Sequence, residues 1–246
     1  MSRCTEMLGR IEGGRVLDVG CGTGRFTRLL AETLRDVHSV VGIDPNKDSI
    51  DEARRSTDDR RITYRLLSVF DLEEEPERFD TVSSGYALHH VTEPQAMLAR
   101  MISVLVPGGT LVVSEPVADG LTPVQMNGRD IHHFKAAVDS ARGLVHRPTF
   151  ERTALRALVM SQNVEITDEC AGEHEAANDN GDGNESADAV RDAIDFLDEY
   201  LPFSKGTDSY GDLSAFRDDL VDRLNEHGIA SPPRLIIVAR KLARGN

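Results

Sequence analysis

Short apolar runs alternate with longer amphipathic segments along most of this chain. The apolar runs are rich in Val, Ile and Leu, which is typical of buried parallel strands. The segments between them repeat their apolar residues every three or four positions, as helices packed on a sheet do. This alternation predicts an α/β fold. The predicted strands lie at 16–19, 39–44, 62–67, 79–83, 110–115, 164–167 and 233–240.

Helical periodicity and capping residues predict the elements between the strands. We expect a short lead-in helix at 2–12 and helices after the first and second strands. Thr92 and Thr149 stand where N-caps of two later helices are expected. Apolar stripes over 190–201 and 213–224 predict two more helices, the second ending at Gly228.

We interpret residues 1–246 as a single domain with three additions to the simple alternation. Residues 117–148 leave the carboxyl end of the fifth predicted strand, where ligands bind in open α/β sheets, and are expected to form a lid. Residues 168–188 are acidic, contain no Lys or Arg, and are expected to form a flexible loop. Residues 187–230 form a helical insertion before the last strand, which we expect at the sheet edge or against a second subunit.

The first predicted strand ends in Asp18 and Val19 and runs into the glycine-rich residues 20–24, GCGTG. Alternate glycines allow a tight turn and a close approach of backbone to a ligand at the start of a helix. A dinucleotide fingerprint would carry its third glycine at position 25, which is Arg25 here. Asp18 would repel a pyrophosphate but suits a ligand end that carries an ammonium group.

Acidic residues also follow the next two predicted strands, at Asp44 and Asp71. A carboxylate at the end of the second strand can accept both ribose hydroxyls of a nucleoside. Together with residues 79–91 and 105–113, these motifs resemble the class I S-adenosylmethionine-dependent methyltransferases, in their ubiquinone/menaquinone-biosynthesis-type small-molecule branch. The resemblance covers roughly the first half of the chain.

This resemblance implies a Rossmann-like three-layer sandwich around a seven-stranded, mostly parallel sheet in the order 3-2-1-4-5-7-6. It implies S-adenosylmethionine as cofactor, S-adenosylhomocysteine as product, and in-line methyl transfer to a small-molecule acceptor. The cofactor-binding residues that it implies are Asp18, Gly20, Cys21, Gly22, Gly24, Asp44, Pro45, Asp71 and Gly85.

Methyl transfer needs a base only when the acceptor must lose a proton. Tyr86 and His90, with His89 between them, follow the fourth strand near the expected methyl position. His133 lies on the predicted lid next to His132, so only one of these two can face the pocket. We therefore name Tyr86, His90 and His133 as catalytic candidates. Simple structural roles remain alternatives for the histidines.

The amino-acid composition limits the classes of substrate, cellular location and cysteine chemistry that we expect for this protein. The net charge of −14 disfavours a nucleic-acid substrate, because Lys and Arg drive phosphate binding. No apolar run is long enough for a membrane span and no secretory signal is evident, which predicts a cytoplasmic protein. Cys4, Cys21 and Cys170 lie far apart without metal-ligand spacing, so we expect neither a disulfide framework nor a metal site.

Two other function classes stay open. A non-catalytic S-adenosylmethionine-binding regulator would carry the same glycine motif, whereas a nicotinamide-binding oxidoreductase is disfavoured by Arg25. The segment after the fourth strand reads Ser83-Ser84-Gly85-Tyr86 and lacks the Pro-Pro-aromatic motif of amino-methylating DNA enzymes. The acceptor atom, oxygen, nitrogen, carbon or sulfur, is not predicted.

Overall fold

A seven-stranded sheet forms the centre of the computed structural model, which describes residues 2–72, 78–172 and 187–243. Its order is β3-β2-β1-β4-β5-β7-β6, which confirms the predicted topology. Strands β1 to β5 run parallel, whereas β7 is antiparallel to both of its neighbours. The strands are β1 (Glu12–Val19), β2 (Arg35–Asp44), β3 (Ile62–Leu66), β4 (Phe79–Gly85), β5 (Leu105–Pro116), β6 (Val164–Gly172) and β7 (Arg234–Lys241).

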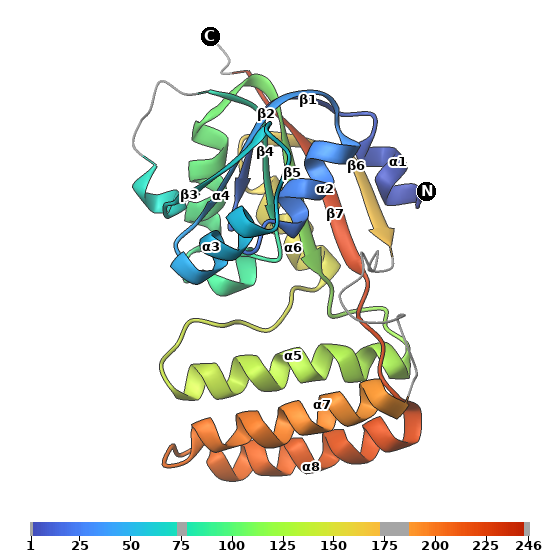
Figure 1. The fold of residues 1–246 in the computed structure, drawn as a ribbon. Coiled ribbons are helices and arrows are strands. Elements are labelled where there is room, and N and C mark those ends of the chain that lie inside the picture. Colours follow the sequence, from blue (N-terminus) through green and yellow to red (C-terminus); the bar gives the residue numbers. More distant parts are fainter. Residues whose placement is uncertain (1, 73–77, 173–186, 244–246) are drawn as a thin grey trace.

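Helices cover both faces of the sheet (Figure 1). One face packs against α1 (Arg3–Leu8), α2 (Arg25–Thr33) and α3 (Lys47–Arg55). The other face packs against α4 (Pro94–Ser103) and α6 (Arg152–Met160). Successive residues of a strand alternate between these two cores, so that Val16 faces the first and Leu17 the second.

Three further helices form a separate layer, α5 (Pro123–Ala141), α7 (Ala187–Tyr200) and α8 (Tyr210–His227). Figure 1 shows this helical layer beyond the carboxyl ends of β4 and β5. Its own apolar core includes Phe134 of α5, Leu197 of α7 and Leu220 of α8. The expected packing of the later helices at the sheet edge is wrong, because their apolar faces are buried against α5. Their contact with a second subunit stays a prediction.

Polar contacts also fasten α5 to α8. Asn127 donates from Nδ2 to the carbonyl oxygens of Arg223 (3.0 Å) and Gly228 (2.8 Å). Arg223 in turn donates to Asp130 at 2.9 Å. Since Asn127 is buried, these bonds satisfy a group that would otherwise be costly to bury.

The sequence placed several helix starts wrongly. Helix α5 begins at Pro123, inside the predicted lid at 117–148, after a capping box of Thr122 and Gln125. Helices α4 and α6 have Glu93 and Glu151 as N-caps, in place of the predicted threonines. Thr149 lies two residues before the N-cap Glu151, and its hydroxyl is paired with His133.

Two expectations about the region near β6 are corrected. Residues 168–172 belong to β6 and pair with β7, so the predicted flexible loop does not begin at Asp168. The rest of that predicted loop, 173–186, lies outside the described residues. A disulfide joins Cys4 of α1 to Cys170 of β6, although their spacing in the sequence gave no sign of it.

Short 3-10 turns complete the described chain, at Val69–Asp71 (η1), Leu88–His90 (η2) and Leu201–Ser204 (η3). Among the residues that the structure describes, no helix has the length and apolar character required to cross a membrane.

Candidate functional site

The glycine turn lies between the end of β1 and the start of α2, at the carboxyl end of the sheet. The backbone N–H groups of Gly20 and Cys21 both donate to the carbonyl oxygen of Ile43, at 2.8 and 3.0 Å. Gly22 has a φ of +51°, and a Cβ there would meet no atom within 4 Å. The backbone of Gly22 therefore borders open space, as a ligand-binding turn requires.

Asp18 lies beneath this turn and is fully buried. Its two carboxylate oxygens accept hydrogen bonds from Thr27 (2.7 Å) and Ser83 (2.8 Å). Burial raises the pKa of Asp18 to about 6 despite these bonds. The carboxylate thus joins β1 to α2 and β4, and its predicted contact with a ligand ammonium stays a prediction.

Asp44 ends β2 beside the turn and is half-buried. It accepts hydrogen bonds from the N–H groups of Gly22 (3.0 Å) and Asn46 (2.8 Å). Pro45 next to it is exposed, as is Asp71 at the end of η1. Phe70 is exposed by 47%, so an apolar ring borders the same edge of the sheet. The predicted ribose and adenine residues therefore lie at the edge that carries the glycine turn.

The remaining members of the predicted cofactor set differ in what they offer. Cys21 packs in the core beside Tyr64. Burial raises the pKa of its thiol, which makes it an unreactive side chain. A Cβ at Gly24 would collide with the Tyr64 side chain, whose hydroxyl donates a hydrogen bond to the Gly24 carbonyl oxygen. Gly85 packs against Phe26, where a Cβ would come within 2.7 Å of the ring.

Tyr86 follows β4 with a φ of +58°, a left-handed conformation that is uncommon for a residue with a side chain. Burial raises the pKa of its hydroxyl to about 12. At neutral pH the phenol keeps its proton, so Tyr86 can donate a hydrogen bond but is unsuited to act as a base.

Four histidines meet where η2 approaches the helical layer. The ring of His132 on α5 lies 4.9 Å from His89 and 4.7 Å from His146, centroid to centroid. His90 lies 4.2 Å from His89 and 4.4 Å from His146. Burial and the charge of neighbouring imidazoles lower the pKa of His132 to about 3 and also lower that of His90. Both rings are therefore neutral at physiological pH.

His133 does not join this cluster. Its Nε2 pairs with the hydroxyl of Thr149 at 2.9 Å and also accepts the N–H of that residue. Of the two adjacent histidines on the predicted lid, His132 thus faces the end of β4, and His133 holds the segment that leads to α6.

Two buried carboxylates orient the cluster, and sequence reasoning missed both. Glu115, at the end of β5, accepts the N–H groups of Ala87 (2.9 Å) and Leu88 (2.8 Å) through Oε1. Its Oε2 lies 2.6 Å from Nδ1 of His89. Glu115 ends a parallel strand as Asp44 does, which is the signal that could have found it.

Asp139 of α5 is the second of these carboxylates. It lies 2.7 Å from Nδ1 of His146 and accepts the hydroxyl of Tyr200 at 2.5 Å. Although burial alone would raise its pKa, the bonds from Tyr200 and His146 lower it. His146 itself follows α5 in a segment with no periodic pattern, and no sequence signal pointed to it.

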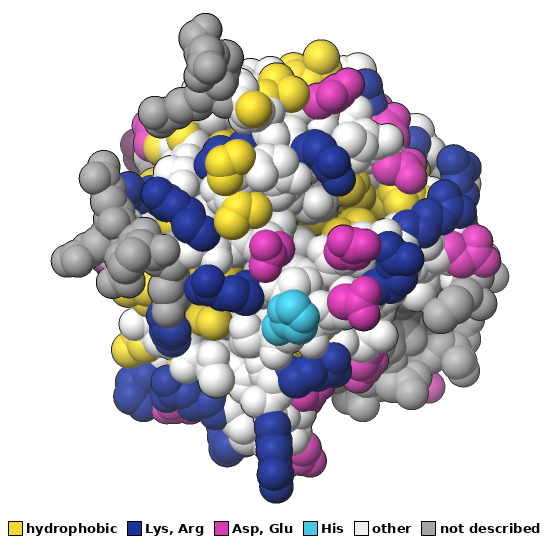
Figure 2. All heavy atoms as spheres, turned by 90° about the horizontal axis from the view of Figure 1, so that it is seen from above, with side chains coloured by type: hydrophobic (Ala, Val, Ile, Leu, Met, Phe, Trp, Pro, Cys, Tyr) yellow, Lys and Arg dark blue, Asp and Glu magenta, His cyan; other side chains and the backbone are white. Residues whose placement is uncertain are grey.

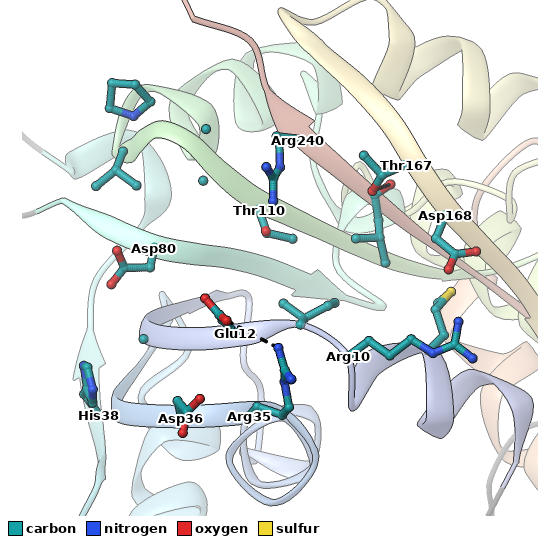
Figure 3. Close-up of a pocket in the computed structure, with 18 residues that line it drawn as sticks. Arg10, Glu12, Arg35, Asp36, His38, Asp80, Thr110, Thr167, Asp168 and Arg240 are labelled. Atoms are coloured by element: carbon teal, nitrogen blue, oxygen red, sulfur yellow. Dashed lines mark hydrogen bonds and ion pairs between the residues drawn. The ribbon is translucent and has the colours of Figure 1, made fainter.

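A wide depression of about 950 Å³ lies at the opposite, amino end of the sheet. Figure 3 shows Arg10, Glu12, Asp80 and Arg240 around it, and Figure 2 views that end of the molecule, where acidic and basic side chains are interspersed. It contains none of the predicted site residues. Ligands in open α/β sheets bind at the carboxyl ends of the strands, so we place the functional site at the glycine turn.

Comparisons with known proteins point to one family. A family model described as a methyltransferase domain matches residues 11–166, more than half of the chain. The ubiquinone biosynthesis O-methyltransferase of Bradyrhizobium sp. is 37% identical over 118 residues, covering 46% of this chain and 44% of that protein. Its counterpart from Rhodopseudomonas palustris is 29% identical over 203 residues, covering 69% of this chain and 76% of that protein.

Solved structures with a similar fold include methyltransferases. A putative methyltransferase from Bacillus halodurans superposes with a TM-score of 0.61 at 16% sequence identity, covering 98% of each chain. At this identity the likeness extends to the fold alone. The matched region spans less than half the length of the Bradyrhizobium protein.

Proposed function

We propose that this chain, which belongs to the class I S-adenosylmethionine-dependent methyltransferases, transfers the methyl group of that cofactor to a small-molecule acceptor beneath the helical layer. Within that family, the chain is placed in the ubiquinone-type branch. The substrate of the ubiquinone enzymes is not carried over, because the match to the Bradyrhizobium protein covers 46% of this chain and 44% of that protein.

The residues at the glycine turn fit this cofactor. The open space at Gly22 admits a ligand against the backbone. Asp44 has spare lone pairs for ribose hydroxyls beyond the two N–H groups that it already accepts. Phe70 offers an exposed ring beside Asp71, where an adenine can pack against an apolar surface.

The bound cofactor supplies a methyl group on a sulfonium, which leaves as a neutral thioether and needs no covalent help. The protein therefore has to hold the acceptor in line and exclude water. Tyr86 can orient an acceptor with its phenolic hydrogen. His90 has a pKa lowered to about 3, so its neutral ring can accept a hydrogen bond from an acceptor hydroxyl but is a weak base.

One observation carries the choice of a small molecule. The ring of His132 lies within 4.9 Å of His89, so α5 closes directly over the segment that follows β4. A helical layer in contact with the residues after β4 favours a small acceptor, and the net charge of −14 disfavours nucleic acid.

Replacement of Asp44 tests the cofactor site. We expect Asp44→Ala to weaken S-adenosylmethionine by roughly 1–3 kcal/mol, because a charge-assisted ribose contact is lost. Calorimetric titration measures the change. Asp195→Ala on the exposed side of α7 is the matched control and should bind as the wild type does. Equal S-adenosylmethionine affinities of the two variants would show that Asp44 does not bind the ribose.

Transfer itself is tested with labelled cofactor and a panel of metabolites that carry hydroxyl, amine, thiol or activated carbon groups. Labelled product supports the enzyme. Tight cofactor binding without product from any acceptor class would favour the non-catalytic binder, and binding of a nicotinamide cofactor instead would favour the oxidoreductase.

A cytoplasmic location and a homodimer are further parts of this proposal. The Cys4–Cys170 disulfide bears on the first, because disulfides are rare in reducing compartments. Alkylation of thiols in intact cells measures the state of the pair, and a fully oxidised pair would oppose a reducing cytoplasm.

A further inference from the structure

Three imidazole rings from separate segments converge at the joint between the sheet and the helical layer. His89 comes from η2, His132 from α5, and His146 from the segment between α5 and α6. One nitrogen of each lies within 4.8 Å of the others. The sequence showed no metal-ligand spacing because these residues meet only in the folded chain.

Hydrogen bonds fix how two of the rings are turned. Oε1 of Glu115 accepts two backbone N–H groups, and its Oε2 faces Nδ1 of His89 as an acceptor. Oδ2 of Asp139 faces Nδ1 of His146 in the same way. A proton held on Nδ1 by each carboxylate leaves the lone pair of the ring on Nε2, which is the atom that can bind a metal ion.

The cluster also contains buried nitrogens that the described residues leave unsatisfied. Nε2 of His132 and Nε2 of His146 are inaccessible to solvent and have no hydrogen-bond partner there. His146 and His89 are exposed by only 5% and 2%. Buried polar atoms without partners are uncommon and costly, which points to a ligand that binds them.

We propose that His89, His132 and His146 bind a divalent transition-metal ion, with Zn²⁺ as the first candidate. Imidazole nitrogen suits this class of ion, whereas Mg²⁺ and Ca²⁺ prefer oxygen. A carboxylate on the far nitrogen of a ligating histidine is a common companion of such sites, and here two of three ligands have one. Three protein ligands leave a further position for water or another ligand.

The required adjustment is small. Nitrogens around a tetrahedral Zn²⁺ lie about 3.3 Å apart, given Zn–N bonds of about 2.0–2.1 Å. From a spacing of up to 4.8 Å, the rings would have to move inward. His146 lies outside helix and strand, so no backbone ladder holds its segment in place. This inference goes beyond the methyl transfer and does not rest on it.

Metal titration tests the site without any assay of activity. Untagged full-length protein, first dialysed against a chelator, is titrated with Zn²⁺ in the presence of a chromophoric competitor. We expect one ion per chain. Co²⁺ in place of Zn²⁺ should give the visible absorption of a four- or five-coordinate ion with nitrogen ligands.

Two variants address ligand and orientation separately. His132→Gln removes one ligand and should weaken Zn²⁺ binding by more than about tenfold and abolish the Co²⁺ spectrum. In Glu115→Gln the amide oxygen would keep the two backbone N–H groups, so its NH₂ would donate to Nδ1 of His89. The ring proton would then move to Nε2, and binding should weaken about 10–100-fold.

Controls separate the site from loss of fold and from adventitious binding. His227→Gln removes an exposed histidine at the end of α8 and should leave Zn²⁺ affinity unchanged. Circular dichroism in chelator checks that each variant is folded. If Glu115→Gln is not, Asp139→Asn makes the same change at His146. Equal Zn²⁺ affinity of wild type and folded His132→Gln, or no binding by the wild type, would overturn the proposal.

Discussion

At the scale of the residue, Asp18 shows a conflict between stability and charge. It is fully buried, and its two hydroxyl partners do not compensate for the loss of solvent, so its pKa rises to about 6. Above that pH the free protein carries a buried, unpaired carboxylate at the glycine turn. Groups destabilised in this way are concentrated at functional sites, which fits the place of Asp18 beneath the proposed cofactor.

The raised pKa predicts how stability depends on pH. An acid with a higher pKa in the folded than in the unfolded state binds more protons when folded, so its contribution falls as pH rises from about 4 to about 6 and is constant above. For Asp18 the fall amounts to roughly 3 kcal/mol. We expect Asp18→Asn to lack this fall in stability. The hydroxyl of Thr27 or Ser83 can rotate to accept a hydrogen bond from the new amide.

Urea denaturation of the free protein and of Asp18→Asn between pH 4 and 8 measures this effect. The difference in unfolding free energy between the two cancels the carboxylates that they share. It should shift in favour of the variant as pH rises through this window. A difference that does not change with pH would mean that Asp18 ionises in the fold as easily as in the unfolded chain.

The residues predicted from the sequence are those whose neighbours are close in the chain. The turn at Gly22 and the acid at Asp44 follow from one strand and the turn after it, and the structure places them side by side. His146 and Asp139 become important only through contacts with η2 and α7, which no local pattern encodes. The positions of side chains across a tertiary contact depend on packing that periodicity does not fix.

At the scale of the element, the helical layer depends on its own core. Helices α7 and α8 bury their apolar stripes against α5 rather than on the sheet. Periodicity predicted that these helices exist but not their partner, since an amphipathic face fits any apolar surface of suitable shape. The helix start predicted at Thr149 is wrong. Thr149 pairs with His133, a tertiary contact that local capping rules do not consider.

Truncation of Phe134 tests the independence of this layer. The side chain is fully buried, and its ring lies 5.9 Å from that of Phe216 on α8. We expect Phe134→Ala to lower the unfolding free energy by about 3–5 kcal/mol, because a cavity remains in the layer. Hydrogen exchange should accelerate in α5, α7 and α8 before it does in β1 or β4.

Cofactor titration completes that test. The glycine turn and Asp44 lie in the sheet, so S-adenosylmethionine affinity should stay within about twofold, a change of roughly 0.4 kcal/mol, while methyl transfer falls. Met160→Ala, which removes an exposed apolar side chain from α6, is the control. Loss of cofactor binding in Phe134→Ala would mean that the layer also shapes the glycine turn.

At the scale of the whole molecule, strand order could be predicted because right-handed crossovers and the family resemblance leave few topologies. The covalent link between α1 and β6 could not. Cys4 and Cys170 are 166 residues apart, and their distance depends on the last strands folding back along β5. The link fastens β6, which is one of the two edge strands and, among the described strands, pairs with β7.

Reduction of this disulfide should destabilise the protein without changing its fold. A bond that closes so long a loop restricts the unfolded chain strongly, and its loss is expected to lower the unfolding free energy by about 2–5 kcal/mol. Urea denaturation with and without reductant measures the effect.

The double variant Cys4→Ser/Cys170→Ser should match the reduced protein and not respond to reductant, whereas Cys21→Ser keeps the disulfide and should respond as the wild type does. Because α1 and β6 are in contact and α1 is also packed in the apolar cluster on its face of the sheet through Met7 and Leu8, native circular dichroism should persist in the reduced state. A wild-type unfolding curve that reductant leaves unchanged would show that these contacts alone hold the edge of the sheet.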